Sequence, residues 1–193
     1  MCIRDSVSID EDLEVHYETI GDLPPIGICG SGLIDVLANM LDRDIIDWRG
    51  RFTEERSSFV IVDRDNPITI SEEDIDKLKL AKAAISLGVK TLVKLFNSTL
   101  EGVDTIYLAG GFGNFISVEN SKKIGLLPDI ELSKIERVGN AALEGAREAL
   151  LSKSRRREVY QIEEKTEHKS LESIPDFSYE YMKELSFEKY MIS

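Results

Sequence analysis

The stretch DTIYLAGGFGN, residues 104–114, indicates the fold class more directly than any other part of the sequence. Its first six residues have the short apolar pattern of a buried strand, and Gly110 and Gly111 follow at once. Because glycine has no Cβ, the end of this strand presents bare backbone, against which a base or a ribose can lie. Taken alone, the same residues are interpreted more simply as an ordinary strand-to-helix turn.

A second glycine cluster, GICGSGLID at residues 27–35, lies upstream. Its glycines let backbone N–H groups converge, and a helix begins directly after them, which together suit a phosphate. We expect Gly30, Ser31 and Gly32 to contact this anion, and Asp35 to accept a ribose hydroxyl. The alternative for the glycines is a tight turn that lets the helix pack closely on the sheet. The alternative for Asp35 is a solvated carboxylate on the helix. The Gly-Lys-Ser/Thr of a Walker P-loop is not present here.

A long helix is predicted between the two clusters, from a capping box at Ser71 to about Phe96. One face carries apolar residues at helical spacing and is expected to be buried: Leu78, Ala81, Ile85, Val89, Leu92 and Phe96. Another face carries a polar stripe: Lys79, Lys82, Ser86, Lys90 and Lys94. The stripe is most simply a solvated surface of the helix.

Downstream of the diglycine, Phe112 and Asn114 complete the candidate site, where Asn114 either binds a base or phosphate or caps the next helix. Asn140 is predicted to cap a helix of small residues that runs to about Lys153. The basic cluster 153–157 is then expected at the C-terminus of that helix, where the dipole favours cations.

Composition limits the function classes. The chain has 193 residues, 42% of them hydrophobic, which suits one globular domain or one lobe plus a tail. Its net charge of −12 argues against partners such as nucleic acid or anionic membrane. No apolar run is long enough to span a bilayer. Two cysteines, Cys2 and Cys29, supply neither an iron–sulfur cluster nor a zinc site, so a cytoplasmic location is expected. His16 and His168 show no partner set, and we expect no metal site.

Strands and helices alternate, and glycine turns join them, so the expected fold class is α/β, with ligands at the carboxyl ends of strands. Several stretches together are similar to the C-terminal ATPase domain of the reductive activators of corrinoid proteins, over roughly residues 15–187. They are GICGSGLIDVLANMLD, IIDWRGRF, AKAAI, IYLAGGFGN, IGLLP and VGNAALEGA. These activators resemble the superfamily of acetate and sugar kinases, heat-shock chaperones and actin.

The resemblance implies an actin-like ATPase lobe on a ribonuclease-H-like fold, a mixed sheet with flanking helices. It implies that the diglycine contacts adenosine and that Lys82, with Lys79 beside it in the stripe, reaches over the nucleotide. It also implies ATP and Mg²⁺ as cofactors, a corrinoid protein as partner, and ATP-driven delivery of one electron to Co(II). Whether the chain forms a homodimer stays open.

The sequence departs from that family in what precedes Gly27. The phosphate motifs and the cysteines of an N-terminal [2Fe–2S] domain are not found there, so we expect an N-terminally truncated fragment that is inactive alone. We expect residues 1–6 to be a non-native start and 7–165 to be the second half of the ATPase domain. Residues 166–193 are expected to form an aromatic tail packed on the body. The alternative functions are a lobe of a small-molecule kinase and a non-catalytic interaction module.

Overall fold

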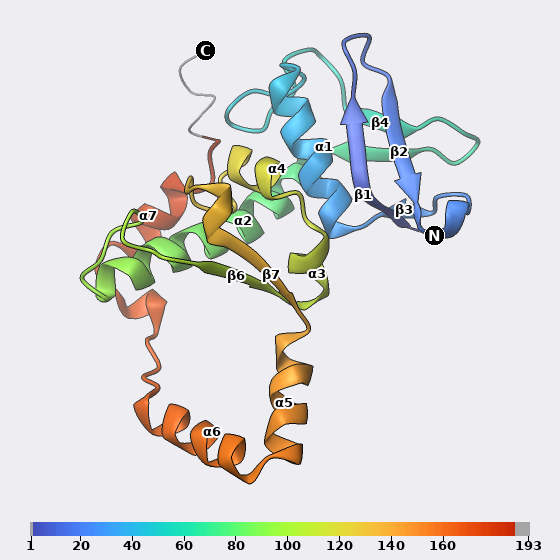
Figure 1. Ribbon diagram of the computed structural model, residues 1–193. Coiled ribbons are helices and arrows are strands. Elements are labelled where there is room, and N and C mark those ends of the chain that lie inside the picture. Colours follow the sequence, from blue (N-terminus) through green and yellow to red (C-terminus); the bar gives the residue numbers. More distant parts are fainter. Residues whose placement is uncertain (1, 188–193) are drawn as a thin grey trace.

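The structure, a computed structural model, describes residues 2–187 and alternates strands with helices, as predicted (Figure 1). Its strands in that range are β1 (Cys2–Ile9), β2 (Val15–Thr19), β3 (Gly27–Ile28), β4 (Ser58–Val62), β5 (Ile68–Ser71), β6 (Ile106–Ala109) and β7 (Ile135–Gly139). Its α-helices there are α1 (Gly30–Asp42), α2 (Glu72–Leu95), α3 (Gly110–Phe115), α4 (Val118–Lys123), α5 (Ala141–Leu151), α6 (Lys153–Lys165) and α7 (Phe177–Lys183). None of the described helices combines the length and the apolar character needed to cross a membrane.

The described strands form three small sheets with mixed directions. β1 lies between β2, which is antiparallel to it, and β3, which is parallel. β4 and β5 form an antiparallel pair, and β6 and β7 a parallel pair. β1 extends from Cys2 across the junction expected at residue 6, with an irregularity in its pairing with β2 between Ile3 and Val7, and its partners include Thr19 and Gly27. That residues 1–6 are a non-native start therefore stays a prediction.

Helix α1 forms the centre of the hydrophobic core. Its side chains are buried on nearly every side, and Val36, Leu37 and Met40 are almost fully enclosed. The Asn39 side chain accepts a hydrogen bond from Ile9 N and donates one to Val7 O, which fixes α1 against the backbone of β1. The first glycine cluster, which begins this helix, is therefore held by the core itself.

The buried face of α2 includes part of the polar stripe, beside the apolar Ile75, Ala83 and Leu87, so the predicted orientation of this helix is wrong. Lys79, Lys82 and Ser86 are buried, whereas Ile85 and Phe96 from the apolar stripe are exposed. Burying an ammonium group is costly unless hydrogen bonds replace its water. Lys79 Nζ donates to Arg49 O and to an Asp76 carboxylate oxygen, and Lys82 Nζ to two carbonyl oxygens near the C-terminus. The capping box at Ser71 is confirmed.

The segment from α7 to Phe187 packs on α2 (Figure 1). Tyr181 Oη donates to Leu80 O, and the Glu184 carboxylate accepts from Ser86 Oγ at 2.7 Å. Phe187 is 1% exposed, and its backbone N donates to Trp48 O at 2.8 Å. Residues 188–193, with the aromatic Tyr190, lie outside the described residues. The boundary of a separate tail at residue 166 stays a prediction.

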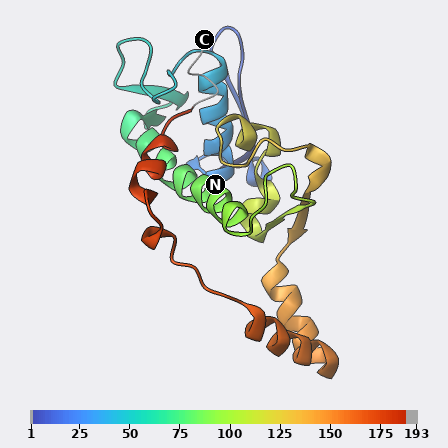
Figure 2. The ribbon, with the colours of Figure 1, turned by 90° about the vertical axis from the view of Figure 1, so that its left-hand side faces the viewer.

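Helices α5 and α6 project from the rest of the molecule, and none of their residues is buried (Figures 1 and 2). Asn140 caps α5 as predicted, since its side-chain oxygen accepts from Leu143 N. The basic cluster is misplaced in the prediction: it begins α6 instead of ending α5. Ser152 explains the difference, because its backbone is extended and its hydroxyl accepts from Arg155 N, which ends one helix and caps the next.

We expect Phe187→Ala to lower the free energy of unfolding by about 3 to 5 kcal/mol, because it empties an enclosed aromatic site. Phe96 is 86% exposed, so Phe96→Ala is the matched control and should change stability by less than about 0.5 kcal/mol. Urea unfolding followed by circular dichroism measures both. Equal effects of the two substitutions would contradict the packing of Phe187 on α2 and Gly50.

Candidate functional site

The two glycine clusters lie against one another. Gly30 begins α1, and Phe112 lies in α3, the short helix that the diglycine opens. A Cβ placed on Gly30 would lie 2.9 Å from Phe112 Cε2, which is closer than real side chains approach. Glycine at position 30 is therefore required for the ring of Phe112 to lie there. The N-terminus of α1 is therefore in contact with the short helix that the diglycine opens.

Gly110 and Gly111 are glycines for different reasons. Gly110 has φ +80°, a left-handed conformation that favours glycine over other residues. Gly111 does not have a positive φ, and a Cβ built on it would meet nothing within 4 Å. Neither the backbone conformation nor the packing of the described residues thus requires glycine at position 111. This leaves open backbone at the end of β6, where a flat group can approach.

The first turn of α1 is only partly accessible. Gly30 is exposed, but Ser31 is 5% exposed and Gly32 is buried, because α1 is surrounded by the core. The first N–H groups of an α-helix have no partner within the helix and carry its partial positive charge. Of the three residues expected to contact an anion, the structure thus leaves Gly30 at the surface.

Asp35 is buried, and the alternative of a solvated carboxylate is wrong. The side chain is 4% exposed, and its Oδ1 accepts from Asn120 Nδ2 at 2.6 Å. Asn120 belongs to α4, so Asp35 ties α1 to that helix. The carboxylate therefore serves the packing of two helices in this structure, a contact that no local pattern in the sequence indicates.

Asn114 is exposed within α3 and does not cap the following helix. Ser117 caps α4 instead, as its hydroxyl accepts from Asn120 N. The capping alternative for Asn114 is therefore wrong, and its amide stays a candidate for binding a base or a phosphate. Phe112 is 50% exposed, so one part of its ring packs on Gly30 and the other meets solvent.

Lys82 is engaged by the C-terminal segment. Its Nζ donates to Glu184 O at 2.6 Å and to Ser186 O at 2.8 Å, and it lies 5.6 Å from the ring centroid of Phe187. The cavity beside it, about 240 Å³, is lined also by Lys90, Lys122 and Lys123 and by no residue of either glycine cluster. The structure thus does not bring Lys82 together with the glycine clusters in one pocket.

A cavity of about 400 Å³ opens beside the first glycine cluster. Gly27, Ile28 and Leu33 line one side, and β5 with the first turns of α2, including Lys77, line the other. Its volume falls within the range of small-ligand sites, about 300 to 1,000 Å³. The sequence pattern gave no sign that the beginning of α2 lies near this cluster.

Glu184 joins α7 to α2 through its carboxylate. Burial by itself raises the pKa of Glu184, but hydrogen bonds from Lys90 and Ser86 outweigh burial and leave that pKa below its ordinary value. The side chain of Glu184 is 11% exposed, whereas that of Lys90 is 47% exposed. The ionised carboxylate therefore holds the C-terminal segment on the polar face of α2.

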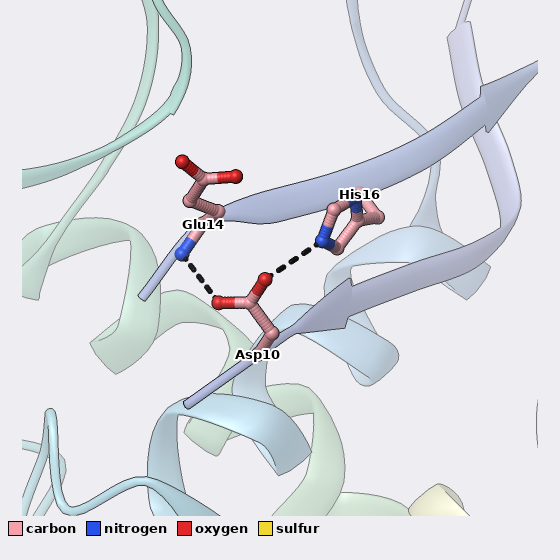
Figure 3. A group of neighbouring side chains, drawn as sticks. All are labelled: Asp10, Glu14 and His16. Atoms are coloured by element: carbon pink, nitrogen blue, oxygen red, sulfur yellow. Dashed lines mark hydrogen bonds and ion pairs between the residues drawn. The ribbon is translucent and has the colours of Figure 1, made fainter. Parts of the chain in front are cut away.

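His16 has partners, contrary to the prediction (Figure 3). Its Nε2 lies 2.9 Å from Asp10 Oδ2, and Glu14 offers a third ligand atom. The three ligand atoms lie within 4.8 Å of one another at the turn between β1 and β2. The spacing of Asp10, Glu14 and His16 on a hairpin could have signalled this group, because paired strands bring such positions together. The structure thus gives His16 a carboxylate partner, and the expectation of no metal site stays untested.

Comparison with known proteins gives consistent matches. The family model described as the C-terminal domain of RACo, the ASKHA domain, matches residues 3–193. The chain is 32% identical to the corrinoid activation enzyme RamQ of Eubacterium limosum over 200 residues, 92% of this chain and 34% of RamQ. It is 29% identical to the Co(II) methylated amine-specific corrinoid protein reductase of Methanosarcina barkeri over 164 residues, 84% of this chain and 29% of that protein.

A solved structure, described as a reductive activator for corrinoid, iron-sulfur protein, is also similar. It is 40% identical and has a TM-score of 0.83, covering 94% of this chain and 32% of that one. The chain thus spans about a third of the length of the curated relatives that it matches.

We expect the stability contributed by Glu184 to depend on pH. A carboxylate whose pKa is lowered by folding stabilises fully above its unfolded pKa, about 4.3, and loses that contribution as pH falls through its folded pKa. Glu184→Gln should therefore lower the free energy of unfolding at about pH 6, and its difference from the wild type should narrow towards about pH 3. Glu180→Gln is the control, since Glu180 bonds only exposed Lys183 among its described ion pairs. Parallel pH profiles for wild type and Glu184→Gln would contradict the ionised contact.

Proposed function

Because the chain belongs to the family of C-terminal ASKHA domains of corrinoid reductive activators, we propose that it is the nucleotide-binding half of an ATPase that drives reductive reactivation of a corrinoid protein. The predicted actin-like fold is confirmed by the family match and the similar solved structure. Both curated relatives are named for corrinoid activation or reduction, which supports this function over a kinase lobe or an interaction module.

The contact of Phe112 with Gly30 is the observation that carries the proposal. It joins a helix N-terminus, which favours anions, to the open backbone at Gly111, which admits a flat group. A nucleotide carries a polyphosphate at one end and a planar base at the other. We assign the phosphates to the beginning of α1 and adenosine to the diglycine, with Asn114 as a further donor or acceptor.

The residues present fit adenosine better than they fit Mg²⁺. This ion prefers carboxylate oxygens and water. Asp35, the acidic residue of the first cluster, is buried against Asn120. We therefore derive no catalytic step through Mg²⁺ from these residues. The role left for this chain is to bind and orient the nucleotide.

The electron that reduces Co(II) needs a carrier that this chain does not supply. Cys2 and Cys29 are its only cysteines, fewer than the four thiolates that hold a [2Fe–2S] cluster. Hydrolysis of the bound nucleotide supplies the free energy for the transfer. In this proposal the cluster lies in the two thirds of the longer relatives that the chain does not cover, or in a separate protein.

We expect Gly111→Val, in a longer protein that contains this domain, to lower ATP affinity by an order of magnitude or more. The branched side chain would occupy the open space beside the diglycine, where a Cβ on Gly111 meets no heavy atom within 4 Å. Calorimetric titration with ATP measures the affinity, and an unfolding curve of the same variant checks that the fold is kept. Gly111→Ala should give a smaller loss. Unchanged ATP affinity in both variants would remove the diglycine from the site.

We expect the chain alone to bind ATP weakly, with a Kd on the order of 1 mM. It supplies contacts to adenosine and a helix dipole, whereas hydrolysis also requires Mg²⁺ and a positioned water to neutralise charge. Phosphate release should not exceed background. A measured turnover near 1 s⁻¹, a typical enzymatic rate, would overturn this assignment. Asp22 and Asp35 would then be the first carboxylates to substitute.

A further inference from the structure

The turn between β1 and β2 gathers three side chains that ligate metals in other proteins (Figure 3). We propose that Asp10, Glu14 and His16 bind a divalent transition-metal ion of the Zn²⁺ class. Each residue offers one ligand atom, and these atoms lie within 4.8 Å of one another. The proposal concerns a site separate from the glycine clusters and is independent of the proposed ATPase function.

The distance between His16 and Asp10 is close to that required by a shared ion. Nε2 and Oδ2 lie 2.9 Å apart. A tetrahedral Zn²⁺ with bonds of about 2.0 to 2.1 Å holds its ligand atoms roughly 3.3 Å apart. A small increase in the distance between the two side chains therefore makes room for the ion. The ion takes the place of the hydrogen between Nε2 and Oδ2, and the neutral imidazole then carries its N–H proton on Nδ1.

The turn holds Asp10 in position before any ion arrives. Its Oδ1 accepts hydrogen bonds from Asp12 N at 3.0 Å and from Glu14 N at 2.9 Å. The backbone is closed as well, because Asp10 N donates to Glu14 O. Oδ2 of Asp10 faces His16, so a small shift of these two side chains and a rotation of the Glu14 side chain complete the site.

The ligand set selects the kind of ion. One imidazole nitrogen with two carboxylates suits Zn²⁺, Ni²⁺, Cu²⁺ or Co²⁺, whereas Mg²⁺ and Ca²⁺ prefer oxygen ligands alone. The side chains of His16 and Asp10 are 61% and 39% exposed, so an ion reaches them from solvent. Three protein ligands leave a fourth position for water. An ion bound only by the folded hairpin also stabilises the fold.

Calorimetric titration of the chain with Zn²⁺ tests the proposal. We expect one ion to bind with a Kd on the order of 10 µM, and His16→Gln and Glu14→Gln each to weaken binding about tenfold or more. Glu18→Gln is the matched control, since Glu18 is exposed further along β2 and its substitution removes the same charge. His168→Gln controls for the other histidine of the chain. Both controls should bind as the wild type does.

A thermal unfolding scan with Zn²⁺ gives a second measurement on the same proteins. The melting temperature of the wild type should rise with Zn²⁺, and that of His16→Gln should not. Because His16 is exposed, the variant is expected to fold, which circular dichroism checks. No heat of binding up to about 1 mM Zn²⁺ would overturn the proposal. Equal binding by His16→Gln, as expected if a cysteine thiol holds the ion, or equal affinity for Mg²⁺, would overturn it too.

Discussion

The missing Cβ of Gly30 is the constraint on which the candidate site depends. It allows an aromatic ring from a distant part of the chain to lie on the beginning of α1, a contact that adds to the hydrogen bond between Asp35 of α1 and Asn120 of α4. α1 in turn is fixed by the core and by Asn39, which bonds the backbone of β1. Through Phe112, the short helix that the diglycine opens thus contacts the most deeply buried helix of the described chain.

A second constraint is the burial of ammonium groups on α2. Lysine is rarely enclosed unless it is paired, because its charge must keep hydrogen-bond partners when water leaves. Lys82 finds them in carbonyl oxygens of the C-terminal segment, and Glu184 adds an ionised contact beside it. These bonds are directional, so they specify where the segment lies more narrowly than apolar packing alone.

The sequence predicts the parts of the structure that rest on neighbouring residues. The caps at Ser71 and Asn140 and the strand before the diglycine are of this kind, since each depends on a few consecutive positions. The buried face of α2 was mispredicted because Glu184 and Ser186, which cover it, are remote in sequence. The break at Ser152 was missed because a serine that caps one helix looks the same in sequence as a serine within a longer one. Asp35 was misjudged for the first of these reasons, because its partner Asn120 is remote in sequence. His16 was misjudged although Asp10 is only six residues away, because the hairpin that brings the two together was not predicted.

The projecting pair α5 and α6 is attached to the body at both ends, through β7 on one side and through the segment packed on α2 on the other. The segment that holds α5 and α6 is therefore a closed loop, because both of its ends are fixed on the body. The entropic cost of closing such a loop grows only slowly with its length, so residues added or removed within it change the closure free energy little. A protease that cut the loop would leave two pieces still joined by the non-covalent contacts of Lys82, Glu184 and Phe187.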